Sequence, residues 1–266
     1  MYWNEEDRFT GAEGASIPWP EKHPSAVWRG VATGGLNRAS NWRAFQRHRF
    51  VAMNNATLLS LSSPQNPPPN FSLKQHPLPT ALEEQQLTLP EWLAPRTDVA
   101  FTDLMCAHKG FWPSCNYTGE YFSPQEAIPM AEQFKHKYLP DIDGNSFSGR
   151  YLGFLRSTSV PVKATLWREW HDARLVAWRH FVPMDSRFGE WWGILGYFLG
   201  GGGGEEVERG RDAVGEGIAL AGREWAERVL RKEDMAVYTL RLLLEYARVA
   251  DERREVMGWV GDLVEG

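Results

Sequence analysis

The chain has 266 residues, of which 42% are hydrophobic and 24% charged, and its formal net charge is −5. This length is enough for one large domain or two small ones. An acidic chain has no electrostatic footprint for nucleic acid, so we interpret the basic cluster at 38–49 as a solvated helix face near an anionic ligand. The sequence shows neither an apolar run of about 20 residues that could span a membrane nor a signal peptide.

The first part of the chain predicts a loop followed by a strand and a helix. Residues 1–27 contain several prolines and show no periodicity, which is typical of a loop. The apolar run 27–32 predicts a short strand, and the glycines in 33–35 predict a turn after it. From Ser40 to Arg49 the apolar spacing predicts a helix capped by Ser40 or its neighbour.

The middle of the chain predicts strands that alternate with helices. Prolines without periodicity predict an exposed loop over 62–80, and 99–105 is a predicted strand. A short helix is expected over 127–137, followed by a strand over 138–143. The next helix is expected over 146–155, with Ser146 or Ser148 as its cap.

The last part adds two strands and two helices. β-Branched and apolar residues predict strands at 160–166 and 180–184, and this alternation predicts an α/β fold with a parallel sheet covered by helices. The glycine run 200–204 predicts a flexible loop and is followed by no phosphate-loop lysine. A helix is expected over 205–230, and another from Asp234 carries apolar residues at helical spacing, which predicts that it is largely buried.

The two cysteines and the glycosylation sequons together favour a secretory compartment. Cys106 and Cys115 are close enough to close a short loop, although their separation does not require a disulfide. Acceptor sequons begin at Asn55, Asn70 and Asn116.

The densest polar stretch runs from Asp141 to Arg150 and allows three interpretations. Asp141 and Asp143 form an Asp-x-Asp pair that could hold a divalent ion against a diphosphate. A calcium loop is rejected, because glycine falls at the fourth position and Leu152 stands where a glutamate is required. An anion site fits best: a strand ends, small residues allow close approach, and a helix begins with Arg150 one turn inside. A plain polar turn is the alternative.

Other polar groups are weaker candidates. The Trp28–Gly30 segment and the turn at 33–35 place an arginine at a strand end beside glycines. Adjacent residues on a helix do not share a face, so Glu169, His171 and Asp172 do not form a catalytic triad. Glu169 alone could accept a hydrogen bond from a ribose hydroxyl. The sequence shows no serine or cysteine nucleophile motif, whereas a hydrolase carboxylate pair has no fixed spacing and stays open.

Taken together, these motifs resemble glycosyltransferase family 90, the CAP10-domain family. It includes fungal capsule-associated xylosyltransferase-like proteins and animal protein O-glucosyltransferases. The matching segments are Trp28-Arg-Gly-Val-Ala-Thr-Gly-Gly35, Lys135-His-Lys-Tyr-Leu-Pro-Asp-Ile-Asp-Gly-Asn-Ser-Phe-Ser-Gly-Arg150, Pro161-Val-Lys-Ala164, Trp167-Arg-Glu-Trp170, Trp178-Arg-His-Phe-Val-Pro183, and Glu224-Trp-Ala through Asp234 with the leucine-rich helix after it.

The resemblance implies a GT-B-like architecture of two Rossmann-like domains, with the donor in the cleft. Residues 1–125 would be the remainder of an incomplete N-terminal, acceptor-side domain, and 126–266 would bind the UDP-sugar. It further implies an inverting transfer of xylose or glucose from UDP-xylose or UDP-glucose to a glycan or protein hydroxyl, without metal or another cofactor. The expected location is the lumen of the ER or Golgi.

The resemblance also assigns site residues. Arg150 would stabilise the leaving diphosphate, and Glu169 is a further donor contact. The remaining expected donor-binding residues are Arg29, Gly30, Thr33, Asp143, Gly144, Ser146, Phe147 and Ser148.

The sequence departs from the family pattern at its start. In the family the catalytic base is an aspartate upstream of the Trp-Arg-Gly motif, and Asp7, the nearby aspartate, falls on the wrong side of the aromatic pair Tyr2-Trp3. We therefore expect the base upstream of Met1, and a chain that is truncated. A non-catalytic nucleotide-sugar-binding pseudoenzyme is the alternative, and full transferase activity in the chain as given would contradict the truncation.

Overall fold

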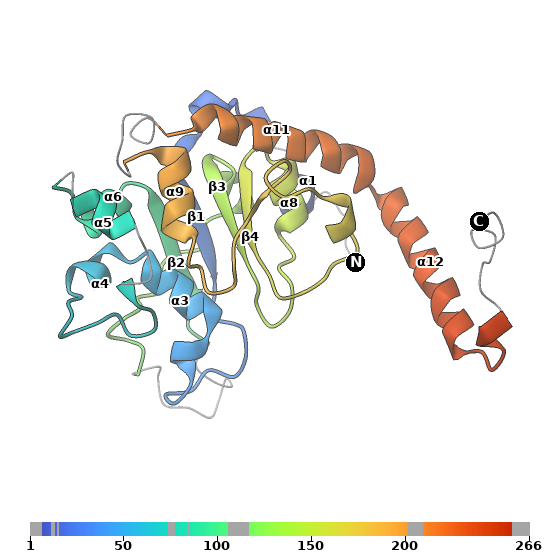
Figure 1. Ribbon diagram of the computed structural model, residues 1–266, viewed down its shortest axis with the longest axis horizontal. Coiled ribbons are helices and arrows are strands. Elements are labelled where there is room, and N and C mark those ends of the chain that lie inside the picture. The colour runs from blue at the N-terminus through green and yellow to red at the C-terminus, as the bar shows by residue number, and fades with distance from the viewer. Residues whose placement is uncertain are drawn as a thin grey trace.

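The computed structural model describes residues 7–11, 14, 16–73, 78–83, 86–105, 117–201 and 210–256 (Figure 1). Its centre is a five-stranded sheet with the order β2-β1-β3-β4-β5, in which every neighbouring pair of strands is parallel. The strands are β1 (His23–Val31), β2 (Thr97–Asp103), β3 (His136–Ile142), β4 (Val160–Ala164) and β5 (Val182–Pro183). The expected α/β fold is confirmed.

Helices cover both faces of this sheet. The α-helices are α1 (Asp7–Thr10), α3 (Gln46–Met53), α4 (Ala56–Ser60), α5 (Leu78–Glu83), α6 (Leu89–Leu93), α7 (Met130–Gln133), α8 (Tyr151–Arg156), α9 (Trp191–Leu199), α11 (Asp212–Val229) and α12 (Lys232–Ala250). Short 3₁₀ turns are η1 (Trp19–Glu21), η2 (Trp42–Ala44), η4 (Asp172–Arg174) and η5 (Arg254–Val256). None of the described helices is both long and apolar enough to cross a bilayer.

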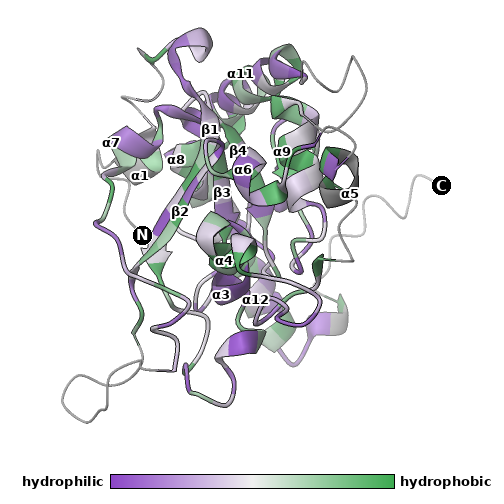
Figure 2. Ribbon diagram, turned by 90° about the vertical axis from the view of Figure 1, so that its left-hand side faces the viewer, coloured by the Kyte–Doolittle hydropathy of each residue, from purple (hydrophilic) through white to green (hydrophobic). Residues whose placement is uncertain are grey.

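Alternation along β1 shows how the two layers form. Successive side chains of a strand point to opposite faces. Trp28 lies in the larger core cluster with residues of α3 and α9, whereas its neighbour Val27 packs against Phe134 and Phe154 on the α7 and α8 side. The larger cluster is rich in aromatic rings, and α9 is coloured largely as hydrophobic in Figure 2. Six of the 13 tryptophans of the chain lie in this cluster, so aromatic rings make up much of the core.

Strands β1 and β3 pair only near their amino ends. Their registered pairs are His23 with His136 and Ala26 with Tyr138, whereas β1 pairs with β2 as far as Val31. The order of the sheet also reverses between these strands, because the chain moves from β1 outward to β2 and then back to β3. In doubly wound sheets such a switch point opens a crevice at the carboxyl ends of the strands, where ligands bind.

Strands on both sides of the expected domain boundary join one sheet. β1 and β2 precede residue 125 and β3, β4 and β5 follow it, and β1 pairs directly with β3. Within the described residues, the boundary at 125 therefore falls between strands of a single sheet. The division into two domains stays a prediction.

Several element boundaries differ from the expectation. Helix α8 begins at Tyr151 after Arg150, not at a serine cap, because residues 143–149 form a turn in which Gly144 N–H donates to the carbonyl of Ser146 at 2.9 Å. The expected helix 127–137 is reduced to α7, and the expected helix from residue 40 is α3, which begins only at Gln46. Helix α5 begins at Leu78, inside the expected 62–80 loop.

The expectation that the last helix is largely buried is wrong. No residue of α12 is buried, and the helix projects away from the body of the molecule (Figure 1). Its first half contacts the rest through the rings of Tyr238 and Trp170, whose centroids are 5.9 Å apart. Apolar periodicity shows which residues share a face of a helix, but it does not show what covers that face.

Asn55, the first residue of a predicted glycosylation sequon, forms hydrogen bonds within the fold. Its Oδ1 accepts a hydrogen bond from the Leu58 N–H at 3.0 Å and caps α4, and its Nδ2 donates to the Tyr121 carbonyl at 3.4 Å. Cys106, Cys115 and Asn116 lie outside the described residues.

Candidate functional site

The loops that follow β1, β3 and β4 carry most of the residues expected to bind the donor. Thr33 follows β1, and Asp143, Gly144, Ser146 and the residues up to Arg150 follow β3. Glu169 lies in the loop after β4. Since all three strands are parallel, these loops meet at one edge of the sheet, beside the switch point between β1 and β3.

Hydrogen bonds tie these loops to one another. Asn145 Oδ1 accepts the N–H groups of Gly34 at 3.0 Å and Gly35 at 3.2 Å. Both glycines have positive φ, and a Cβ at Gly35 would lie 2.7 Å from the Phe45 ring, so the turn requires glycine. Asp143, which is 1% exposed, accepts the Leu166 N–H at 2.7 Å through Oδ2. These hydrogen bonds hold the three loops together at one edge of the sheet.

Thr33 and Gly144 lie close together, on the loops after β1 and β3. A Cβ at Gly144 would lie 2.9 Å from Thr33 Oγ1 and 3.0 Å from a guanidinium nitrogen of Arg47. Gly144 therefore allows the loops after β1 and β3 to approach closely. Burial raises the pKa of the neighbouring Asp143, and its hydrogen bond from Leu166 partly opposes the shift.

Arg150 lies at the switch point. It caps α8, and its Nη1 donates to the Arg29 carbonyl of β1 at 2.7 Å. The guanidinium lies 5.6 Å from the ring centroids of both Trp28 and Phe154. Burial lowers the pKa of Arg150, and Asp141 partly opposes this shift. Because an arginine stays protonated in proteins, Arg150 places a fixed positive charge between β1 and α8.

The side chain of Arg29 is engaged elsewhere. Its Nη2 forms an ion pair with Asp98 of β2 at 2.7 Å, and its Nε donates to the Glu126 carbonyl at 3.3 Å. It also lines surface pockets beside β2 together with Gln125. The structure thus brings the Arg29 main chain to Arg150 but holds its guanidinium at the sheet edge. Gly30 packs against Trp28, whose ring would lie 2.7 Å from a Cβ at that position.

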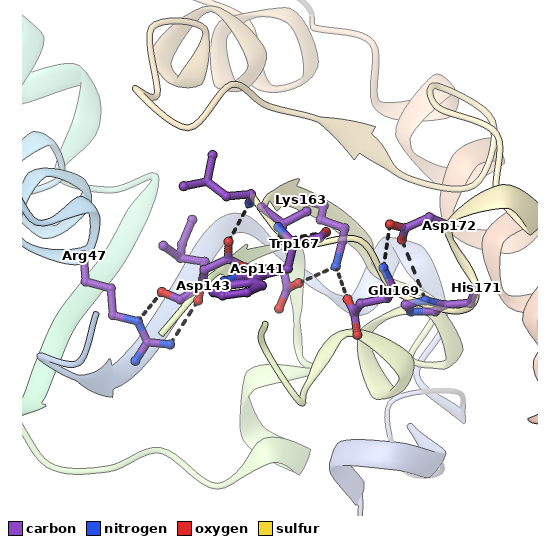
Figure 3. Close-up of polar contacts among 11 residues, drawn as sticks. Arg47, Asp141, Asp143, Lys163, Trp167, Glu169, His171 and Asp172 are labelled. Atoms are coloured by element: carbon purple, nitrogen blue, oxygen red, sulfur yellow. Dashed lines mark hydrogen bonds and ion pairs between the residues drawn. The ribbon is translucent and has the colours of Figure 1, made fainter. Parts of the chain in front are cut away.

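A buried ionic network supports Glu169 (Figure 3). Lys163 Nζ lies 2.9 Å from Glu169 Oε2 and 3.2 Å from Asp141 Oδ2, and it sits 3.8 Å above the ring of Tyr151. Burial raises the pKa of Glu169, and Lys163 opposes this shift. Burial alone would lower the pKa of Lys163, but the two carboxylates raise it above its usual value. Lys163 therefore fixes the position of Glu169 and keeps its charge compensated.

Exposed apolar side chains surround the carboxyl-end loops. Leu36 follows β1, Phe147 follows β3, and Leu166 and Trp167 follow β4; their exposed fractions are 59%, 50%, 74% and 48%. Ser146 is exposed beside Phe147, whereas Ser148 is buried. The exposed rings of Phe147 and Trp167 offer flat faces on which a sugar or a base could pack.

Among the described residues, Glu169, His171 and Asp172 have ligand atoms within 4.8 Å of one another. Lys163 already occupies Glu169 Oε2, and Asp172 Oδ2 accepts the Glu169 N–H at 2.9 Å. A metal ion bound at Glu169 Oε2 would have to displace the Lys163 ammonium. The contacts of Glu169 therefore favour an ionic network, in which Lys163 is the cation, over a metal site.

Sequence reasoning assigned no role to three residues that shape the site, and it placed Arg47 in a basic cluster interpreted as a solvated helix face, whereas Arg47 is buried. Asn145 joins two loops, Lys163 holds Glu169, and Arg47 of α3 donates to main-chain carbonyls at the crevice. Lys163 could have been noticed, because it is a lysine inside an apolar strand, and such a residue requires a buried partner. The contacts of Asn145 and Arg47 span about a hundred residues and leave no local pattern.

A comparison with protein-family models agrees with this geometry. The model described as Glycosyl transferase family 90 matches residues 114–258, a little more than half of the chain. Among the described elements, the matched part contains β3, β4 and β5, the loops after β3 and β4, and helices α7, α8, α9, α11 and α12.

Proposed function

The chain belongs to glycosyl transferase family 90, and from this premise we propose that it binds a UDP-sugar at the carboxyl ends of β1, β3 and β4 and transfers the sugar. The main observation in support of a donor site here is the position of Arg150. It is a half-buried cation at the switch point of the sheet, beside loops that hydrogen bonds already join. The proposed donors are UDP-xylose and UDP-glucose, and the proposed acceptor is a hydroxyl of a glycan or protein.

In the proposed complex Arg150 offsets negative charge on the diphosphate as the sugar leaves it. An arginine offers a planar fork of donors that matches phosphate oxygens, and such charge-assisted hydrogen bonds are the strong ones. The Glu169 carboxylate accepts a ribose hydroxyl, and Lys163 holds it in place for that contact. Phe147 and Trp167 supply exposed rings at the rim.

We further propose an inverting transfer that requires no metal ion, because Arg150 places a fixed positive charge at the proposed site. The acceptor hydroxyl needs a base, and none is assigned among the described residues. A secretory location is proposed on the grounds of family membership.

The first experiment is calorimetric titration of the protein with UDP, with and without EDTA. We expect binding in both, with the same affinity. Binding that EDTA abolishes would contradict the metal-independent site, and a folded protein without UDP affinity would contradict the donor site itself. Binding of UDP with no transfer to any acceptor hydroxyl would favour a non-catalytic binding protein.

Arg150→Ala should weaken UDP binding by roughly 1.5–3 kcal/mol, about 10- to 150-fold in Kd, because one charge-assisted interaction is lost. The same titration measures it. Arg228→Ala is the matched control, since Arg228 pairs with Glu224 on the exposed surface of α11 and should leave the Kd unchanged. An unchanged Kd in a folded Arg150 variant would remove Arg150 from the donor site.

A further inference from the structure

Arg47 is buried between the two strands that separate at the switch point. It is the second residue of α3 and is 9% exposed. Its guanidinium donates through Nη1 to the Val31 carbonyl at 2.8 Å and through Nη2 to the Ile142 carbonyl at 3.0 Å. Through Nε it donates to the Asp143 carbonyl at 2.8 Å (Figure 3). One side chain thus contacts the carboxyl ends of both β1 and β3.

These contacts lie where the sheet has no ladder between the two strands. β1 and β3 pair at His23 and Ala26, and no registered pair follows toward Val31 or Ile142. Buried carbonyl groups need donors, and here the guanidinium of Arg47 supplies them. The Gln46 side chain adds a second donor to the Asp143 carbonyl at 2.9 Å.

The three carbonyls lie at the base of the proposed donor loops. Val31 lies two residues before the 33–35 turn, and Ile142 and Asp143 precede Gly144 and Asn145. Gly144 has no side chain where Arg47 and Thr33 approach it. Burial lowers the pKa of Arg47 to about 10, with a further contribution from Arg150, so the guanidinium is still charged at neutral pH.

We propose that Arg47 is a positioning residue for the donor site: its guanidinium joins the diverging ends of β1 and β3 and so fixes the loops after them for a nucleotide diphosphate. The inference rests on the proposed donor site. Each of the three guanidinium nitrogens of Arg47 already donates to a main-chain carbonyl. Arg47 therefore acts on the ligand by positioning the loops and by its charge.

Arg47→Ala and Arg47→Lys test this role by two measurements. Calorimetry gives the Kd for UDP below the melting temperature, and hydrogen exchange gives the protection of the Gly34, Gly35 and Gly144 amides. We expect a Kd about 10- to 100-fold higher in Arg47→Ala, since small misplacement of a binding group has effects of this size. Those amides should exchange faster, while the amides of β4 remain protected. Arg47→Lys retains the positive charge but not the planar set of donors. Its Kd and its exchange rates should lie between those of the wild type and those of Arg47→Ala.

Chemical rescue separates positioning from general structural damage. Millimolar guanidinium chloride should restore UDP binding to Arg47→Ala by occupying the vacated site, whereas the same concentration of sodium chloride should not. Arg43→Ala is the matched control, because Arg43 is exposed above the Trp42 ring and should leave the Kd unchanged.

Two results would overturn the inference. One is an unchanged Kd with unchanged exchange at the three glycines in Arg47→Ala. The other is faster exchange throughout the sheet with no rescue by guanidinium, which would make Arg47 a general structural residue. If the wild-type protein binds no UDP, the donor site fails, but exchange at Gly34, Gly35 and Gly144 still tests whether Arg47 fixes the loops.

Discussion

Lys163→Met is expected to lower the free energy of unfolding by about 3–5 kcal/mol at neutral pH, because removal of one member of a buried ion pair leaves uncompensated charge in the interior. Lys163 is 5% exposed, and its partners Asp141 and Glu169 have side chains that are 0% and 13% exposed. Without the ammonium, two carboxylates remain near each other in the interior. The loss is therefore much larger than the loss of a hydrogen bond at the surface.

Urea unfolding followed by tryptophan emission measures this loss. Lys135→Met is the matched control: Lys135 pairs with Glu132 at 2.7 Å, but both side chains are about half exposed, so we expect a change below about 1 kcal/mol. The triple variant Lys163→Met, Asp141→Asn, Glu169→Gln removes every charge of the network and should recover most of the stability. A Lys163 variant within 1 kcal/mol of the wild type would contradict the network.

Acidification is expected to unfold the protein between pH 6.5 and 4, because two buried histidines must stay neutral. His48 is 0% exposed and His171 is 4% exposed, and burial lowers the pKa of each to about 4. In the unfolded chain a histidine titrates near 6.5. The unfolded state therefore binds more protons than the folded state in this window. The stability is fully present above pH 6.5 and is lost as the pH falls toward 4.

The size of this effect approaches the whole stability of a domain. A depression of the pKa from 6.5 to about 4 corresponds to about 3 kcal/mol for each histidine, against about 5–15 kcal/mol for a typical domain. Urea unfolding at a series of pH values gives the slope, which should approach that of three protons below pH 6, because burial also lowers the pKa of the half-buried His136 to about 4. His48→Gln and His171→Gln should each lower the slope by about one proton. A stability that does not change between pH 7 and 5 would contradict the assignment.

The matched control for this pH series is His23→Gln. His23 begins β1 with an exposed side chain, so the substitution removes a histidine without touching either buried imidazole. Since the His23 ring lies 5.0 Å from that of His136 and helps to lower the His136 pKa, we expect this variant to keep the protons that His48 and His171 contribute and to change the slope only through His136. The comparison of slopes is informative even if a glutamine at position 48 or 171 changes the stability at neutral pH.

The parallel sheet could be predicted from sequence because short segments rich in apolar residues alternate with predicted helices along the chain. β3 and β4 were expected within about two residues of their observed bounds, since nearly every residue of either strand is buried and neither shows a polar face. The expected helix start at Ser146 or Ser148 failed for a physical reason. These serines lie in a turn that Asn145 and Asp143 hold across the crevice, and Ser148 is buried there.

The candidate site could be predicted in part. The loop from Asp143 to Arg150 was expected to bind an anion, and the structure places it beside Thr33 at the switch point of the sheet. Arg29 could not be placed from sequence. Its main chain and its guanidinium contact different parts of the molecule. The carbonyl accepts a hydrogen bond from Arg150, whereas the side chain pairs with Asp98 of β2. Which residues of β1 face β2 depends on long-range pairing.

The exposed surface of α12 decides which optical method will report unfolding. Its apolar residues Val237, Tyr238, Leu240, Leu242, Leu243, Leu244, Tyr246 and Val249 are all more than one third exposed. Hydrophobic dyes such as ANS fluoresce on surfaces of this kind. The folded protein should therefore already be bright, and a dye-based melting curve would begin from a high signal. Tryptophan emission is the better signal, because Trp28, Trp42, Trp92, Trp191 and Trp192 are fully buried and reach water only on unfolding.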